Sequence, residues 1–146
     1  MALDVPRPAL KGRKALVIGI ANEHSIAFGC AKAFRELGAD LAITYLNDKA
    51  RPHVDPLARA LDASLFLPLD VMTEGALEKV FDEVTAKWGR LDILVHSIAF
   101  APKEDLQGGL LDCSAAGFGK AMDVSCHSFV RMAKLAVPLM SDGGTM

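Results

Sequence analysis

A glycine-led turn near the start of the chain has the composition of a phosphate-binding turn. Residues 19–27 (Gly-Ile-Ala-Asn-Glu-His-Ser-Ile-Ala) follow a short apolar run and begin a segment with helical spacing. A helix N-terminus offers free backbone N–H groups and a partial positive charge to a phosphate. Ser25 either caps this helix or donates its hydroxyl to a pyrophosphate. Because the common Gly-x-Gly-x-x-Gly pattern is absent, both a phosphate site and an ordinary capped helix remain open.

The turn after the second apolar run bears on the choice of cofactor. An acidic residue there would hold a ribose 2′-hydroxyl, and an arginine would accept a 2′-phosphate. The sequence places Leu46 at this point, with Lys49 and Arg51 close by. An uncharged Leu46 mildly favours NAD(H) over NADP(H). A plain surface loop is also compatible with these residues.

Two further turns carry side chains that suit a nucleotide. Asp70, next to Val71, follows the third apolar run and either accepts a hydrogen bond from an adenine amino group or caps the next helix. The segment Ser97-Ile98-Ala99 follows the fourth run, and small residues there would let a ribose and a nicotinamide approach the backbone. Small residues also end strands where no ligand binds.

Other residue types that perform chemistry lack the spacing that would support it. The four histidines form no metal-binding pattern, and His96, at the end of an apolar run, is predicted to be a structural histidine. Tyr45 and Lys49 match a Tyr-x-x-x-Lys pattern, but they would lie at the adenosine end of a cofactor, far from a hydride, so we assign them no catalytic role. The three cysteines are widely spaced, which is typical of reduced thiols in a cytoplasmic protein.

An alternation of apolar runs and helical segments must position these turns. Strands are predicted at 14–20, 41–45, 64–69 and 91–96, helices at 25–37, 49–62, 73–88 and 114–139, and a loop at 99–112. Strands that alternate with helices of about 10–15 residues predict βαβ units with helices on both faces of a parallel sheet. We expect Thr73 to cap the third helix. The fold class is therefore α/β, a Rossmann-type doubly wound sheet.

The last part of the chain predicts a packed helix and an interrupted fold. A set of mostly apolar residues recurs along the last helix at steps of four and three, which predicts one packing face: Phe118, Met122, Ser125, Phe129, Met132 and Ala136. Residues 141–146 resemble a turn and the start of a fifth strand. We therefore expect residues 1–146 to form one dinucleotide-binding domain that is truncated after about four strands.

Composition argues against several classes of protein. Hydrophobic residues make up 51% and charged residues 23% of the 146 residues, as in ordinary globular domains. The net charge of −2 argues against nucleic acid or an anionic membrane as the main partner. No apolar run has the length of a transmembrane helix.

Together these segments closely resemble the bacterial NADH-dependent enoyl-[acyl-carrier-protein] reductases, a divergent group of short-chain dehydrogenases/reductases. The resemblance extends from about residue 10 to the end of the chain and rests on five segments: Gly19-x5-Ser25-Ile26-Ala27, Thr44-Tyr45-x-Asn47-Asp48-Lys49, Leu69-Asp70-Val71, the run from His96 to Pro102, and Asp123-Val124-Ser125. The first and fourth are the specific ones, because ordinary members have Thr-Gly-x3-Gly-x-Gly and Asn-Ala-Gly there. The segment Ser97-Ile98 counts against an ordinary short-chain alcohol dehydrogenase.

The resemblance implies a role for each matched position. Contacts with the NAD cofactor would come from Gly19, Ala21, Ser25 and Ile26 along the pyrophosphate and nicotinamide, Leu46 beside the adenosine ribose, Asp70 and Val71 at the adenine, Ser97, Ile98 and Ala99 along the cofactor, and Val124 near the nicotinamide. Ala101 would touch the acyl substrate, and Ser125 stands where ordinary members have a catalytic Asn. Leu46 replaces a Gln of many relatives, which leaves the choice between NADH and NADPH open.

The resemblance also implies a reaction whose catalytic pair this sequence lacks. The family reduces 2-enoyl-acyl-carrier-protein with NADH in fatty acid elongation, where a Tyr-x6-Lys stabilises the enolate and positions the nicotinamide ribose. Tyr45 is the only tyrosine here, and a proline occupies position 52. We therefore expect an amino-terminal half that binds part of a dinucleotide without turnover. The implied partners are the carrier-protein-bound substrate and further copies in a homotetramer; a non-catalytic dinucleotide-binding or assembly module is the alternative.

Overall fold

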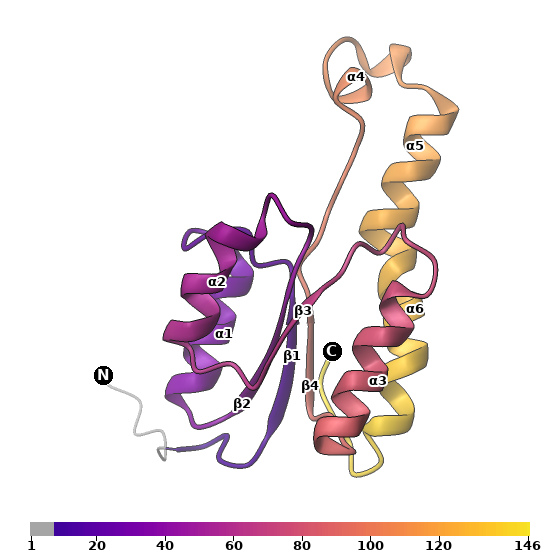
Figure 1. The fold of residues 1–146 in the computed structure, drawn as a ribbon. Coiled ribbons are helices and arrows are strands. Elements are labelled where there is room, and N and C mark those ends of the chain that lie inside the picture. The colour runs from indigo at the N-terminus through magenta and orange to yellow at the C-terminus, as the bar shows by residue number, and fades with distance from the viewer. Residues whose placement is uncertain (1–7) are drawn as a thin grey trace, which may run out of the picture.

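A parallel four-stranded sheet forms the centre of the protein in a computed structural model, which describes residues 8–146 (Figure 1). The strands are β1 (Lys14–Ile18), β2 (Asp40–Tyr45), β3 (Leu65–Pro68) and β4 (Ile93–His96), in the order β3-β2-β1-β4. This order reverses between β1 and β4, so the turns after these two strands border the crevice where doubly wound sheets bind ligands.

Alternating side chains of the central strands build a separate core on each face of the sheet. Ala15 and Val17 of β1 pack with α1 (Ile26–Glu36) and α2 (Arg51–Ala60) on one face. Leu16 and Ile18 pack on the other face with α3 (Ala76–Trp88) and α6 (Ser128–Ala136). Figure 1 shows these two helix pairs on opposite sides of the strands. The predicted doubly wound arrangement is confirmed.

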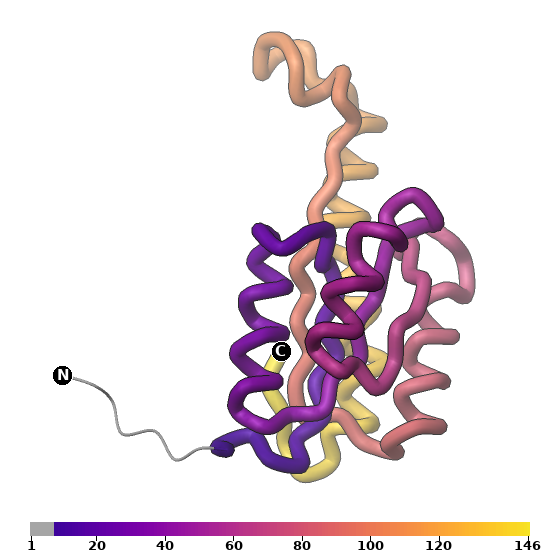
Figure 2. Tube along the Cα trace, turned by 60° about the vertical axis from the view of Figure 1, so that its left-hand side comes forward, coloured from indigo at the N-terminus to yellow at the C-terminus, as the bar shows by residue number. Residues whose placement is uncertain are grey.

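A long helical column follows β4 and rises beyond the end of the sheet. Residues 99–112 are not all loop, because they contain α4 (Lys103–Leu106) and a 3-10 turn (Leu110–Asp112). The column itself consists of α5 (Ala115–Met122), a π-turn (Asp123–His127), α6 and a final 3-10 turn (Val137–Leu139). In Figure 2, α5 and the segment before it stand clear of the layered part of the molecule. The predicted helix at 114–139 is therefore continuous but not regular.

The π-turn changes which side chains of this column face the core. The Ser128 N–H donates to the carbonyl of Asp123, five residues back, and this wider turn shifts the helical face. From the π-turn to the end of α6, the buried residues follow steps of four: Val124, Ser128, Met132 and Ala136. The predicted packing face is wrong for Phe118 and Met122, which are 61% and 46% exposed because α5 lies beyond the sheet. It is also wrong for Phe129, which follows the π-turn and is 36% exposed.

Helix α3 begins later than predicted. Thr73 does not cap it; the helix begins at Ala76, and Gly75 precedes it in a left-handed conformation with φ of 73°. Asp70 does not cap α3 either, because its carboxylate accepts the Met72 N–H at 2.9 Å. The Thr73 N–H donates to the carbonyl of Asp70, so residues 70–73 form a separate turn before the helix.

A buried carboxylate joins the amino-terminal ends of β1 and β4. Asp92 is 5% exposed and accepts hydrogen bonds from the Lys14 N–H and from Arg13, both at 2.8 Å, as well as from Arg90. Burial raises the pKa of Asp92, but the hydrogen bonds from Arg90, Arg13 and Lys14 outweigh it, and the pKa falls below its usual value.

The far side of β4 receives the last residues of the chain. The Thr145 N–H donates to the carbonyl of Asp92 and the Leu94 N–H to the carbonyl of Thr145, each at 2.9 Å. Ile93 and Thr145 thereby form a parallel bridge. The predicted start of a fifth strand is confirmed.

Replacing Asp92 with Asn tests this anchor. We expect the free energy of unfolding at neutral pH to fall by about 1–3 kcal/mol, because two arginines lose their charged acceptor. With a lowered folded-state pKa, the contribution of Asp92 is complete above its ordinary pKa and disappears as the pH falls through the folded value. Chemical denaturation measured as a function of pH therefore gives a shallower acid dependence for Asp92→Asn.

The matched control is Asp82→Asn, at an exposed position of α3. It should leave both the stability and its acid dependence within about 0.5 kcal/mol of the wild type. An unchanged acid profile in Asp92→Asn would contradict the role given to this carboxylate.

Candidate functional site

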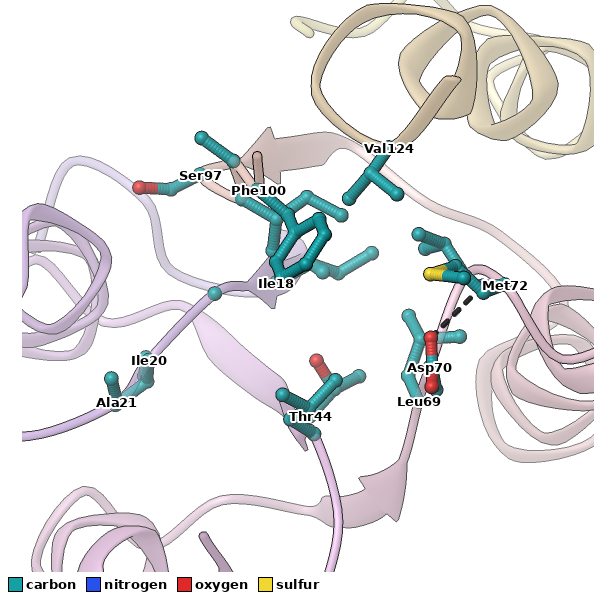
Figure 3. Close-up of a pocket in the computed structure, with 15 residues that line it drawn as sticks. Ile18, Ile20, Ala21, Thr44, Leu69, Asp70, Met72, Ser97, Phe100 and Val124 are labelled. Carbon is teal, nitrogen blue, oxygen red and sulfur yellow. Dashed lines mark hydrogen bonds between the residues drawn. The ribbon is translucent and has the colours of Figure 1, made fainter. Parts of the chain in front are cut away.

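A cavity of about 430 Å³ opens where the strands end, between the two helix layers (Figure 3). Most positions predicted to contact a cofactor line it: Gly19 and Ala21 after β1, Leu46 after β2, Asp70 and Val71 after β3, Ser97, Ile98 and Ala99 after β4, and Val124 from the π-turn. The fold thus brings together residues from five separate segments of the sequence.

Gly19 allows the ends of β1 and β4 to approach each other. Its φ is +112°, and a Cβ built on it would overlap the carbonyl oxygen of Ser97 and lie 2.5 Å from the carbonyl carbon. The Ser97 N–H donates to the carbonyl of Ile18 at 2.9 Å, which fixes this approach. A side chain at position 19 would not fit between the two strand ends, so Gly19 itself presents only backbone to the cavity.

Ser25 and Ile26 lie outside the residues that line the cavity. Ser25 precedes the first residue of α1, but its side chain accepts no capping hydrogen bond; its hydroxyl donates instead to the carbonyl of Asn22 at 2.6 Å. Ile26 begins α1 and is 80% exposed. The first N–H groups of α1 have no acceptor within the helix, so this end of the helix offers donors that suit an anion.

The end of the cavity beside β2 and β3 offers a carboxylate and an apolar edge. One oxygen of Asp70 accepts the Met72 N–H, which fixes the side chain and leaves the second oxygen as an acceptor. Leu46 is 55% exposed at the rim. Arg51 lies over the ring of Tyr45 at 5.7 Å, and that ring is itself buried against Phe66. Tyr45 is therefore a core residue.

The opposite end of the cavity is closed by Phe100 and Val124. The Ser125 hydroxyl accepts the Phe100 N–H at 3.0 Å and lies 3.2 Å from the Phe100 carbonyl, to which it donates. These contacts hold the segment after β4 against the π-turn, and in Figure 3 the Phe100 ring lies beside Val124 at the cavity. Ala101 follows Phe100 but does not line the cavity.

His96 is linked to the Val124 side of the cavity through Ser128. Its Nε2 lies 2.7 Å from the hydroxyl of Ser128, which also donates to the carbonyl of Val124 at 2.7 Å. Burial lowers the pKa of His96, so the neutral imidazole is favoured. The prediction of a structural histidine with a hydrogen-bond partner is confirmed.

Several lining residues were not identified from the sequence: Ile18, Ile20, Thr44, Leu69, Met72 and Phe100. Ile18, Ile20 and Met72 had only their position beside a predicted site residue as a signal. Thr44, Leu69 and Phe100 stand in the segments that carry the family resemblance, but no role was assigned to them. They make the cavity wall largely apolar, as small-molecule sites usually are.

These features fit a dinucleotide. The backbone-only contact at Gly19 and the free end of α1 suit a pyrophosphate, the free oxygen of Asp70 suits an adenine amino group, and the apolar wall suits flat rings. Within residues 8–146, no three potential metal ligands gather into a site. In the same range, no helix combines the length and apolar character that a membrane crossing requires.

The sequence and the structure both match known proteins. A family profile described as enoyl-(acyl carrier protein) reductase matches residues 19–146. The enoyl-[acyl-carrier-protein] reductase [NADH] FabI of a Nostoc species is 46% identical over 140 residues, which are 94% of this chain and 54% of that protein. Its counterpart in Haemophilus influenzae is 40% identical over 138 residues.

Solved structures of such reductases share the fold. The enzyme of Anaplasma phagocytophilum, solved in complex with NAD, matches with a TM-score of 0.90 and 38% identity over 99% of this chain and 56% of that one. The Aquifex aeolicus enzyme gives 0.89 and 40% over 94% and 55%. The chain spans about half the length of the curated relatives it matches.

Gly19→Ala tests the approach of the two strand ends. We expect the free energy of unfolding to fall by about 2–4 kcal/mol, because the new methyl group meets the Ser97 carbonyl and the backbone is left-handed. Chemical denaturation measures this change directly.

Gly29→Ala provides the control, since Gly29 lies on an exposed part of α1 and a Cβ there has nothing within 4 Å. It should stabilise the protein by up to about 1 kcal/mol through helix propensity. Equal stabilities of the two variants would mean that Gly19 does not constrain the strand ends.

Proposed function

The chain belongs to the enoyl-(acyl carrier protein) reductase family, and on that premise we propose that its cavity binds NADH and that the enzyme containing it reduces 2-enoyl thioesters of acyl carrier protein. One observation carries the proposal: the cavity gathers, from five segments, most of the positions that the resemblance assigns to the cofactor. The Anaplasma phagocytophilum enzyme, solved in complex with NAD, supports it through 38% identity.

The proposed placement follows from the chemistry of each wall. The turn from Gly19 to Ala21 and the start of α1 at Ile26 would hold the pyrophosphate, since backbone N–H groups and the helix dipole favour an anion. The free oxygen of Asp70 would accept from the adenine amino group, with Val71 against the ring.

The nicotinamide would lie toward Val124, along the backbone of residues 97–99. The cofactor supplies the hydride for the β-carbon of the enoyl group. Phe100 and Val124 would exclude water from that end, and Ser125 keeps Phe100 in place through its backbone. Ala101, the next residue, would face the acyl chain.

Cofactor choice would depend on the rim at Leu46. This side chain offers a 2′-phosphate no charge, and Arg51 already lies over Tyr45. We therefore propose NADH rather than NADPH as the preferred cofactor.

A further part of the proposal concerns assembly. The column of α5 and α6 exposes a series of apolar side chains: Phe118, Met122, Phe129, Val130 and Val137. Exposed apolar patches of this kind mark interaction surfaces. We propose that this face packs against further copies in a cytoplasmic homotetramer.

Turnover with a defined protein tests the function. We expect the enzyme containing this chain to oxidise NADH when a 2-enoyl thioester is added, followed by the loss of NADH absorbance. Residues 1–146 alone lack a Tyr-x6-Lys pair, so they should bind NADH without oxidising it. Intact mass must be measured on the same sample.

Each outcome separates the candidates. Turnover by a 15.6 kDa chain would contradict the need for a tyrosine and a lysine. NADH binding without turnover by any longer form would favour a non-catalytic dinucleotide-binding module. Absence of NADH binding would contradict the proposed function altogether.

Replacing Ala21 by residues of opposite charge tests the proposed position of the pyrophosphate. Ala21 is exposed at the cavity rim, so neither variant disturbs the core. Ala21→Asp should weaken NADH binding about tenfold by repulsion, equal to about 1.4 kcal/mol, whereas Ala21→Lys should bind NADH at least as tightly as the wild type. Calorimetric titration measures both.

The comparison distinguishes charge from size, because lysine is the larger side chain. Weaker binding in Ala21→Lys than in Ala21→Asp would mean that the rim contact is steric, and the pyrophosphate placement would then be wrong.

A further inference from the structure

Arg131 reaches from α6 to the loop that follows β3. Its Nη1 donates to the carbonyl of Val71 at 3.1 Å, a contact between residues 60 positions apart. Val71 is 5% exposed and lines the cavity on the side that we assign to adenine. Arg131 is therefore the contact by which the helical layer holds the backbone of this loop.

The same guanidinium faces the π-turn. Its Nη2 lies 3.7 Å from one oxygen of the Asp123 carboxylate, and the other oxygen lies 3.1 Å from Nδ1 of His127. Asp123 adjoins Val124, which forms the opposite cavity wall. One side chain thus connects the two walls between which a ligand must fit.

The packing of α6 does not require this arginine. Met132 and Ala136 supply the buried apolar contacts of the helix, whereas the Arg131 side chain is 36% exposed. Its Nε and Nη2 are buried and have no hydrogen-bond partner within the described residues. The bond to Val71 and the attraction to Asp123 are therefore the polar contacts that fix the guanidinium across the two walls.

We propose that Arg131 is a positioning residue that sets the distance between the adenine-side loop at Val71 and the π-turn at Asp123, and thereby the affinity for the adenosine half of the cofactor. This inference rests on the proposed NADH site. Arg131 hydrogen-bonds a cavity-lining residue at Val71 and approaches the nicotinamide side only through Asp123, beside Val124. Its loss should therefore alter cofactor affinity and leave the chemical step unchanged.

Arg131→Met in the full enzyme provides the test, because methionine keeps an unbranched apolar stem and removes both polar contacts. We expect the Kd for NADH, measured by calorimetric titration, to rise about tenfold. The Kd for reduced nicotinamide mononucleotide, which lacks the adenosine half, should stay within about twofold of the wild type. The KM for NADH should rise while kcat is retained.

Three companion variants make the result decisive. Lys134→Met, one turn along the same helix at an exposed position, removes a charge without facing the loop and should bind NADH like the wild type. Arg131→Lys keeps a donor for the Val71 carbonyl and should recover part of the affinity. Asp123→Asn weakens the contact to the π-turn and should raise the NADH Kd by a smaller factor than Arg131→Met.

The possible outcomes distinguish a failure of the role given to Arg131 from a failure of the proposed NADH site. Equal NADH affinities of the wild type and Arg131→Met would overturn the role of Arg131 while the NADH site stands. A parallel loss for both ligands would also overturn it, because a general distortion would explain that loss. Should Arg131→Met fail to fold, unchanged NADH affinity in both Arg131→Lys and Asp123→Asn would overturn it. A wild type that binds no NADH would overturn the proposed function and this inference together.

Discussion

The approach of β1 to β4 at Gly19 is the constraint on which the site depends. A side chain at this position would meet the carbonyl of Ser97, so the two strand ends meet through backbone alone. The turn after β1 lines the cavity as far as Ala21 and then leads into α1 at Ile26. The sheet order β3-β2-β1-β4 places this junction where the strand order reverses. One backbone conformation therefore couples the topology of the sheet to the turn where we propose that the pyrophosphate binds.

The π-turn is the second element that the site requires. It inserts a wider turn into the helical column, directs Val124 to the cavity and places the Ser125 and Ser128 hydroxyls against Phe100 and His96. π-turns occur often at functional sites because they reorient side chains without ending the helix. The segment after β4 is thereby hydrogen-bonded to the helical column at two points, at Phe100 and at His96.

The sequence predicts this fold well where local patterns decide the outcome. Apolar runs located the four strands, and the turns after β1, β3 and β4 indicated Gly19, Asp70 and Ser97 as site residues. Helix α3 was misplaced at Thr73 because the left-handed conformation of Gly75 separates the turn from the helix. The π-turn was missed because a shift of one residue leaves the three- and four-residue spacing almost unchanged. Contacts such as Arg131 to Val71 join residues far apart in the sequence, and no local pattern contains them.

The central claim is that the backbone junction at Gly19 and the π-turn enclose one dinucleotide site. A crystal structure of the protein grown with saturating NADH measures this most directly. The account predicts the pyrophosphate beside Gly19 and the start of α1, the adenine against Asp70 and Val71, and the nicotinamide toward Val124. Cofactor density at any other surface, or a reversed orientation with the nicotinamide at Asp70, would contradict it.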